Sequence, residues 1–267
     1  MSASLFDRPA VLFLPASNER AIAKAKASAA DLVILDMEDA VKADDKVKAR
    51  EMAVAAVAED WPMPVAIRLN GVHSPEYAAD LTAVMHSKCQ HFVMPQVAQA
   101  SDVMNLRRLT SKPVAAMIET PAAIVNAAAI AKEAAMLIVG TNDLRTAIGI
   151  ETGGSRLPIM MALQATILAA RVAGIPVVDG VYNKLDDEEG LLAEAREGRS
   201  LGFDGKSLIH PNQIDACHAA WAPTLEQIAR AERLVEAATG GAERFEGEMI
   251  ETMHVEAARR LLDRAKR

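Results

Sequence analysis

Acidic residues follow several short apolar runs of this sequence. Asp36, Glu38 and Asp39 come after one run, Glu119 comes directly after a second, and Asp143 follows a third. Carboxylates gathered in one place repel each other unless a cation or a substrate compensates them. Because no cluster of His or Cys accompanies them, a hard divalent ion, Mg²⁺ or Mn²⁺, suits these ligands better than zinc or copper. The pattern therefore predicts a magnesium site.

A single arginine ends another apolar run, in the segment AIRLN at Ala66–Asn70. A cation at the end of a buried run needs an anionic partner, because an isolated charge is costly to remove from water. Two interpretations of Arg68 stay open: it neutralises Glu38 or Asp39, or it binds a carboxylate of a substrate.

Helix capping is the competing explanation for these acids. An acidic residue directly after a strand often caps the next helix, and Asp36, Asp143 and Asp179 are each placed to do so. For any one of them, capping and catalysis explain the position equally well. Three carboxylates within four residues at 36–39, together with Glu119, exceed what capping requires, so we favour a functional site for the set.

Other patterns that carry chemistry are weak. The segment Gly149–Ser155 is rich in glycine but lacks the P-loop lysine and the G-x-G-x-x-G spacing, so we interpret it as a connection. Only His210 among the six histidines follows a predicted strand. Cys89 and Cys217 lie far apart without C-x-x-C spacing, which excludes a zinc ribbon and favours a reducing compartment, with the cytoplasm as the expected location.

The elements that must position these residues are eight short apolar runs, most of them followed by a stretch with helical spacing. Most of these runs are apolar throughout, as is typical of parallel strands buried on both faces. The runs are Val11–Leu14, Leu32–Leu35, Val65–Leu69, Phe92–Met94, Val114–Ile118, Leu137–Val139, Ile175–Val178 and Lys206–Ile209. We predict helices at Glu19–Ala30, Asp45–Ala58, Pro121–Ala134, Pro158–Ala173 and Asp186–Leu201. Eight strand-then-helix units predict a (β/α)₈ TIM barrel, in which residues after the strands share one rim.

The last part of the chain differs from the barrel units. We assign residues 1–221 to the barrel, as the catalytic domain, and 222–267 to a C-terminal helical extension with a Gly-rich break at 240–241. This arm is too small for a convincing independent domain, so we expect it to pack on its own barrel or, as we favour, on a neighbouring subunit.

Composition limits the partners. The chain has 267 residues, with 29 Lys+Arg against 36 Asp+Glu, a formal charge of −7, and only 3% aromatic residues. An acidic chain with few aromatics is a poor candidate for binding nucleic acid. No apolar stretch approaches the length of a membrane span, and the N-terminus lacks the basic region of a signal peptide.

A series of motifs runs through almost the whole chain. The segments are VLFLP at 11–15, VILDMEDAV at 33–41 with Lys46 and Arg50 after it, AIRLN at 66–70, VMPQV at 93–97, MIETP at 117–121, VGTNDL at 139–144, DGVY at 179–182 and GFDGKSLIHPNQI at 202–214. In combination they resemble the citrate lyase beta-subunit-like family of the HpcH/HpaI aldolase group. This resemblance implies a TIM barrel, usually a homotrimer or hexamer, that cleaves or forms a carbon–carbon bond in a 3-hydroxy acyl-CoA with Mg²⁺.

The resemblance also implies roles for individual residues. Glu119 and Asp143 match the metal ligands, Arg68 matches the residue that holds the substrate carboxylate or thioester carbonyl, and Glu38 and Asp39 match acids that hold metal-bound waters. Phe13, Arg20, Ile209 and His210 match the segments around CoA.

Three departures from the family pattern bear on this assignment. The catalytic base of the malyl-CoA and citramalyl-CoA lyases is an Asp in an M-[IV]-D motif that reaches a neighbouring subunit, and Glu251 stands at that position here. Ala16 replaces a glycine after the first-strand proline, and Asn142 replaces a glutamate beside Asp143.

Three functions remain open. The first is an acyl-CoA carbon–carbon lyase that acts on citryl-, malyl- or citramalyl-CoA and releases a small keto acid such as oxaloacetate, glyoxylate or pyruvate. The second is a malyl-CoA-type thioester hydrolase, in which the same metal and Arg68 would polarise the thioester carbonyl for attack by water. The third is a non-catalytic subunit of a larger citrate lyase-like complex.

Overall fold

The computed structural model describes residues 8–266 of the chain. These residues form two compact units, one extending to Ala220 and the other beginning at Trp221. Each unit has its own core, and the two are described separately below.

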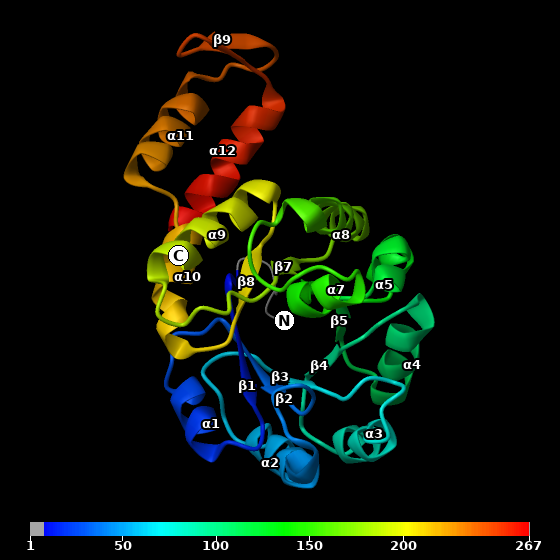
Figure 1. The fold of residues 1–267 in the computed structure, drawn as a ribbon. Helices are drawn as coiled ribbons and strands as arrows, with labels where there is room; N and C mark the ends of the chain where they lie inside the picture. Colours follow the sequence, from blue (N-terminus) through cyan, green and yellow to red (C-terminus); the bar gives the residue numbers. More distant parts are fainter. Residues whose placement is uncertain (1–7, 267) are drawn as a thin grey trace. The chain divides into compact units, whose positions relative to one another are not determined.

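The first unit is a closed barrel of parallel strands surrounded by helices (Figure 1). Within residues 8–220, eight strands pair in sequence order, and β8 closes the barrel by pairing with β1. The strands are β1 Ala10–Pro15, β2 Leu32–Asp36, β3 Val65–Arg68, β4 His91–Met94, β5 Val114–Ile118, β6 Met136–Val139, β7 Val177–Asp179 and β8 Gly205–Leu208. The predicted TIM barrel is confirmed.

Helices cover the outside of the barrel in the order of the strands (Figure 1). They are α1 Glu19–Lys26, α2 Lys46–Ala56, α3 Tyr77–Met85, α4 Ala100–Thr110, α5 Pro121–Val125, α6 Ala127–Ala131, α7 Thr141–Ala147, α8 Met160–Ala173, α9 Glu188–Leu201 and α10 Ile214–Trp221, with short 3₁₀ turns at Ala43–Asp45, Leu157–Ile159 and Pro211–Gln213.

Small differences from the predicted elements have local causes. The helix expected at Pro121–Ala134 is divided into α5 and α6 at Asn126, whose amide donates to the Ala98 carbonyl outside the helix (2.8 Å). The first helix ends at Lys26 rather than at Ala30. The Ser28 hydroxyl donates a hydrogen bond to the Ala25 carbonyl (2.7 Å) and so competes with the backbone hydrogen bonds of the helix.

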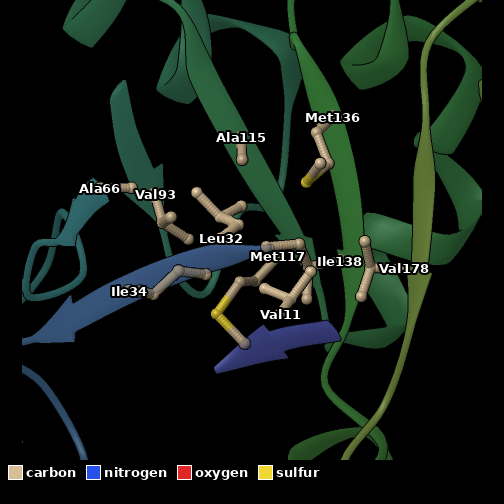
Figure 2. Packing of buried hydrophobic residues seen from close by; sticks show 10 residues of the cluster. All are labelled: Val11, Leu32, Ile34, Ala66, Val93, Ala115, Met117, Met136, Ile138 and Val178. Atoms are coloured by element: carbon tan, nitrogen blue, oxygen red, sulfur yellow. The ribbon is translucent and has the colours of Figure 1, made fainter. Parts of the chain in front are cut away.

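The barrel core consists of apolar side chains from consecutive strands (Figure 2). The cluster contains Val11, Leu32, Ile34, Ala66, Val93, Ala115, Met117, Met136, Ile138 and Val178, with Phe13 packed against it. Because side chains alternate between the two faces of a strand, residues two positions further along share this inward face. The same parity therefore directs Asp36, Arg68 and Glu119 to the top of the core.

The second unit consists of two helices and a hairpin. In residues 221–266, α11 Leu225–Ala237 packs against α12 Thr252–Ala265, and β9 Glu243–Phe245 pairs antiparallel with β10 Glu248–Ile250. Ala231, Leu234, Phe245, Ile250 and Ala258 form its core. The hairpin was not predicted. Its two-residue turn, Glu246-Gly247, has positive φ at both positions, which Gly tolerates without cost.

None of the helices within residues 8–266 is long and apolar enough to cross a membrane. Both cysteines, Cys89 and Cys217, are buried and free.

Candidate active site

A cavity of about 340 Å³ opens at the C-terminal ends of the barrel strands. Its walls come from β1, β2, β3 and β5 and from the segments that follow β6, β7 and β8. The lining includes Phe13, Asp36, Asp39, Arg68, Asp143 and Ile209. The structure thus brings Asp36, Asp39, Arg68 and Asp143 to one cavity, whereas Glu38 and Glu119 are buried and are not among the residues that line it.

Arg68 is held by two carboxylates. The register of β2 and β3 sets Asp36 beside Arg68, and the guanidinium donates to both oxygens of Asp36, from Nε at 2.6 Å and from Nη2 at 2.5 Å. Nη1 lies 2.8 Å from Oε2 of Glu38. Burial alone would lower the pKa of Arg68, but Asp36 and, to a smaller extent, Glu38 raise it, so the guanidinium stays charged.

This pairing bears on the first interpretation of Arg68. Its principal partner is Asp36, and it also contacts the carboxyl group of Glu38, one of the two acids expected. Within the described part of the chain, Asp39 forms no ion pair with Arg68. The guanidinium carbon of Arg68 lies 5.4 Å from the centroid of the Phe13 ring. This cation–π contact places an apolar side chain beside the charged one in the lining of the cavity.

Asp36 also organises the segment after its strand. Its carboxylate accepts from the backbone N–H groups of Glu38 (2.8 Å) and Ala40 (3.0 Å). The alternative that Asp36 caps the next helix is wrong, because Lys42 and Asp45 are the N-caps of the two helical segments that follow. Asp179 caps no helix either: it pairs with Arg156 (2.6 Å) and Lys206 (3.3 Å). Asp187 is the N-cap of α9.

Glu38 is a buried acid with a strongly raised pKa. Its side chain accepts a hydrogen bond from the Gln96 amide (3.0 Å) in addition to its contact with Arg68. Burial raises the pKa of Glu38 to about 8 although Arg68 opposes this effect, and Asp39, Glu119 and Asp36 raise it further. At neutral pH this carboxyl group is mostly protonated unless additional positive charge is present.

Glu119 has one satisfied and one unsatisfied oxygen. Oε1 accepts from the Gln96 backbone N–H (2.6 Å), while buried Oε2 has no hydrogen-bond partner among the described residues. Burial raises the pKa of Glu119 to about 7, with Gln96 and Arg68 opposing the rise and Asp143 and Asp39 adding to it. A buried oxygen without a partner is costly, so this atom marks a place for a missing donor or cation.

Gly140 allows this carboxylate to come close to the next strand. A Cβ atom at position 140 would overlap the Glu119 side chain, including the unpaired Oε2. The glycine before Thr141 is therefore required by packing rather than by an unusual backbone angle.

Asp143 and Asp39 are exposed at the same cavity. Partial loss of water around Asp143 raises its pKa, and the charge of Asp39 raises it further, with Arg68 opposing. The N-cap of α7 is Gly140, so Asp143 lies inside the first turn and does not act as the N-cap.

These acids fit a magnesium ion. In residues 8–266 no group of three His, Cys, Asp or Glu side chains forms a metal site by itself. Mg²⁺ usually keeps several waters and takes one or two protein carboxylates, so two ligands are sufficient. The unpaired Oε2 of Glu119 and the exposed carboxylate of Asp143 are the candidates for them, and burial is the main cause of the raised pKa of both groups.

A network of buried side chains fixes the segments after β2 and β3. The Lys46 ammonium donates to the carbonyls of Met37 (2.8 Å) and Glu38 (2.7 Å) and to Oδ1 of Asn70 (2.7 Å). Fully buried Asp80 accepts from the backbone and the amide of Asn70 (2.9 and 2.7 Å) and pairs with Arg50 (2.8 Å). The position of Glu38 therefore depends on α2 and α3.

The remaining predicted site residues lie in three places. Ile209 lines the cavity, whereas His210 caps the turn at 211–213, its Nδ1 accepting from Asn212 N (3.2 Å). Arg20 is exposed on α1 and is not among the residues that line the cavity. Glu251 is the N-cap of α12 in the second unit, and its backbone N–H donates to Nδ1 of His254 (2.9 Å).

The sequence places Gln96 after the fourth predicted strand but assigns it no role in the site. It bridges the two buried acids, since its backbone N–H binds Glu119 and its side-chain amide binds Glu38. Its φ of 51° lies in the left-handed region, which is uncommon for a residue other than Gly. The available signal was its place directly after the fourth apolar run.

Comparison with known proteins supports this description. The family model for HpcH/HpaI aldolase/citrate lyase matches residues 9–211. A (3S)-malyl-CoA thioesterase of Cereibacter sphaeroides is 38% identical, over 96% of this chain and 94% of that protein. The citrate lyase subunit beta of Escherichia coli is 31% identical, over 97% of this chain and 93% of that protein.

A solved structure has a similar fold over almost the whole chain. The protein CitE from Mycobacterium tuberculosis, crystallised with magnesium, acetoacetate and coenzyme A, superposes with a TM-score of 0.89. It is 32% identical, and the match covers 97% of this chain and 98% of that one.

The fold and the cavity define a TIM barrel with a carboxylate-rich, arginine-containing site at the C-terminal ends of its strands. With a family match over most of the barrel and relatives aligned almost end to end, the chain belongs to the HpcH/HpaI aldolase/citrate lyase family.

Proposed function

We propose that this protein is a Mg²⁺-dependent carbon–carbon lyase acting on a 3-hydroxy acyl-CoA such as citryl-, malyl- or citramalyl-CoA. The observation that carries the proposal is the unpaired, buried Oε2 of Glu119, which faces Gly140 beside a cavity that also holds Asp143 and Arg68. Relatives described as a citrate lyase subunit and as a CitE structure with magnesium and coenzyme A support the substrate class.

The reaction needs stabilisation of negative charge. Cleavage removes the proton of the 3-hydroxyl group, breaks the adjacent C–C bond, and leaves the electron pair on the thioester as an enolate, which takes up a proton to give acetyl-CoA. When bound by Glu119 and Asp143, magnesium would supply a Lewis acid for the oxygens of the substrate. Arg68 contributes a fixed positive charge at the wall of the cavity, where it holds the substrate carboxylate or thioester carbonyl.

The other residues orient the substrate and move its proton. Glu38 and Asp39 hold water molecules beside the metal ligands. Phe13 and Ile209 provide apolar walls for the acyl-CoA, with Arg20 and His210 outside this cavity as contacts for its CoA part. Glu251 takes the role of the base, and we assign it to the site of a neighbouring subunit in a homotrimer or hexamer located in the cytoplasm.

Thioester hydrolysis is the second candidate, favoured by the 38% identity to a (3S)-malyl-CoA thioesterase. Both reactions need the thioester carbonyl to be polarised, so the same acids and Arg68 would serve either one. They differ in which bond breaks: hydrolysis breaks the C–S bond and leaves the C–C bond intact.

Product analysis tests the proposal. Purified protein with Mg²⁺ is incubated with each of the three thioesters, and the products are separated by liquid chromatography. A lyase gives acetyl-CoA with oxaloacetate, glyoxylate or pyruvate, respectively. Free CoA with intact citrate, malate or citramalate would instead establish hydrolysis.

Two controls complete the experiment. Chelation of Mg²⁺ and the variant Glu119→Gln are each expected to abolish turnover. A magnesium-loaded protein that is inert towards all three thioesters would contradict the proposal, and activity that appears only after partner subunits are added would favour the third function, a subunit of a larger complex.

A further inference from the structure

A second cavity of about 210 Å³ adjoins the active cavity in the barrel unit. Thr141, Asn142, Val181 and Asn183 line both cavities. Between them, the side-chain amides of Asn142 and Asn183 donate to each other's oxygens at 3.2 and 2.8 Å. These two residues form an uncharged partition between the cavities.

Arg145 is an unusual residue in the wall of the second cavity. Its side chain is almost completely removed from solvent, with a residue exposure of 6%. Its guanidinium donates to the backbone carbonyls of Glu151 (3.2 Å) and Ser155 (2.7 Å). A guanidinium has five N–H donors, and these contacts use two of them.

The charge of Arg145 is not balanced by an acid. Among residues 8–266, no Asp or Glu forms an ion pair with Arg145. A buried cation without an anionic partner is costly, because carbonyl dipoles only partly replace the water that has been lost.

The other charged residues of this cavity already have partners. Arg156 pairs with Asp179 (2.6 Å) and Glu197 (3.2 Å), and Glu194 pairs with Lys206 (2.7 Å). Exposed Lys184 adds a second positive charge at the cavity, 3.8 Å from Asp187. The cavity therefore carries a positive charge that an anion would compensate.

We propose that the second cavity binds a small oxyanion, a carboxylate or phosphate group, with Arg145 as its cation. The partition of two neutral amides offers donors to such a group without repelling it. The segment Gly149–Ser155, which on sequence grounds was only a connection, closes this cavity through Gly153 and Gly154 and is held by Arg145.

Gly154 provides a matched pair of variants. Nothing lies within 4 Å of a Cβ atom built at this position, and its φ of 72° is in the region that Asn and Asp adopt more readily than other non-glycine residues. Gly154→Asp and Gly154→Asn therefore make the same steric and backbone demands. Only the first adds a negative charge at the wall of the cavity.

The test is equilibrium binding of succinate and of inorganic phosphate to the full-length protein, measured by isothermal titration calorimetry. We expect Gly154→Asn to bind the preferred probe like the unmodified protein, within about twofold, and Gly154→Asp and Arg145→Gln to bind it at least about tenfold more weakly. Equal unfolding temperatures of the two Gly154 variants serve as the folding control. Unchanged affinity in Gly154→Asp, or absence of binding of both probes to the unmodified protein, would overturn the proposal.

A second arm distinguishes the source of the oxyanion. If it belongs to the acyl chain of a substrate, Gly154→Asp raises KM for the thioester that carries the additional carboxylate and leaves kcat unchanged. If it is a free acid or phosphate, Gly154→Asp leaves KM for the thioester unchanged. In that case the variant loses any effect that added succinate or phosphate has on the rate of the unmodified protein. The binding measurement needs no turnover, so its outcome is independent of the lyase proposal.

Discussion

The pairing of Arg68 with Asp36 shows how a buried cation can be fixed before any substrate arrives. Both carboxylate oxygens of Asp36 accept hydrogen bonds from the guanidinium, and they also accept from two backbone N–H groups of the segment after β2. Both side chains are almost completely buried, so removing either one leaves the other without its principal partner of opposite charge.

Asp36→Asn is therefore expected to destabilise the protein by about 3–5 kcal/mol, because the amide cannot compensate the buried guanidinium. Urea denaturation followed by circular dichroism measures this change. Asp39→Asn, in the same segment but exposed, is the control and should change the stability by less than about 0.5 kcal/mol. Equal effects of the two variants would mean that Asp36 does not hold Arg68 in solution.

The raised pKa of Glu38 predicts a pH dependence of stability. A carboxyl group whose folded-state pKa is about 8 instead of 4.5 binds its proton more tightly in the folded state, so its ionisation destabilises the metal-free protein as the pH rises between these values. The variant Glu38→Gln lacks this ionisation. We therefore expect the difference between its unfolding temperature and that of the unmodified protein to increase from about pH 5 to about pH 8. Thermal unfolding of both proteins in a chelating buffer measures the difference, and parallel curves would refute this origin.

At the scale of elements, the segments that carry the acids are fixed by the helices behind them. Lys46 comes from α2 and Asp80 from α3, and they meet at Asn70, after β3. The segment after β2 is therefore held by residues of two neighbouring βα units, which explains how such a short segment keeps Glu38 in place.

Asp80→Ala is expected to cost about 3–5 kcal/mol in stability, because it leaves Arg50 and the Asn70 backbone N–H without their buried partner. Glu76→Ala removes only the half-buried partner of the same arginine and should cost about 1 kcal/mol or less. Chemical denaturation of both variants tests this order. A reversed order would show that the surface pair, and not the buried one, positions α3.

Much of the fold was predictable from the sequence, because parallel barrel strands are apolar on both faces and each is followed by a helix. Less of the site was predictable. That Asp36, rather than Asp39, holds Arg68 depends on the strand register, and the role of Gln96 depends on a positive φ after β4. The hairpin of the second unit was missed because each of its strands has only three residues, too few for an alternating pattern.

At the scale of the whole molecule, several of the acidic residues behind the formal charge of −7 are concentrated at one place. Asp36, Glu38, Asp39, Glu119 and Asp143 lie around one cavity or next to it, and the described structure balances them with Arg68. A divalent cation would reduce the repulsion that remains among them, so the stability of the entire barrel should respond to magnesium.

Magnesium at about 100 times its dissociation constant should stabilise the protein by about 2.7 kcal/mol, which for a protein of this size raises the unfolding temperature by about 5–10 °C. Differential scanning fluorimetry across a magnesium titration measures this shift. The variant Glu119→Gln should show almost none of it. The same shift in both proteins would place the ion elsewhere.

The two cysteines have a practical consequence for the C-terminal unit. Both are buried, and burial raises the pKa of Cys89 to about 11 and that of Cys217 to about 12, so neither thiol ionises appreciably under ordinary labelling conditions. Thiol-reactive dyes should therefore leave the native chain unmodified. Met249→Cys, at a residue 68% exposed on β10, would then accept a single fluorophore. A second cysteine introduced on the barrel would carry a second dye. Energy transfer between the dyes at these two positions would then report the distance between the C-terminal unit and the barrel.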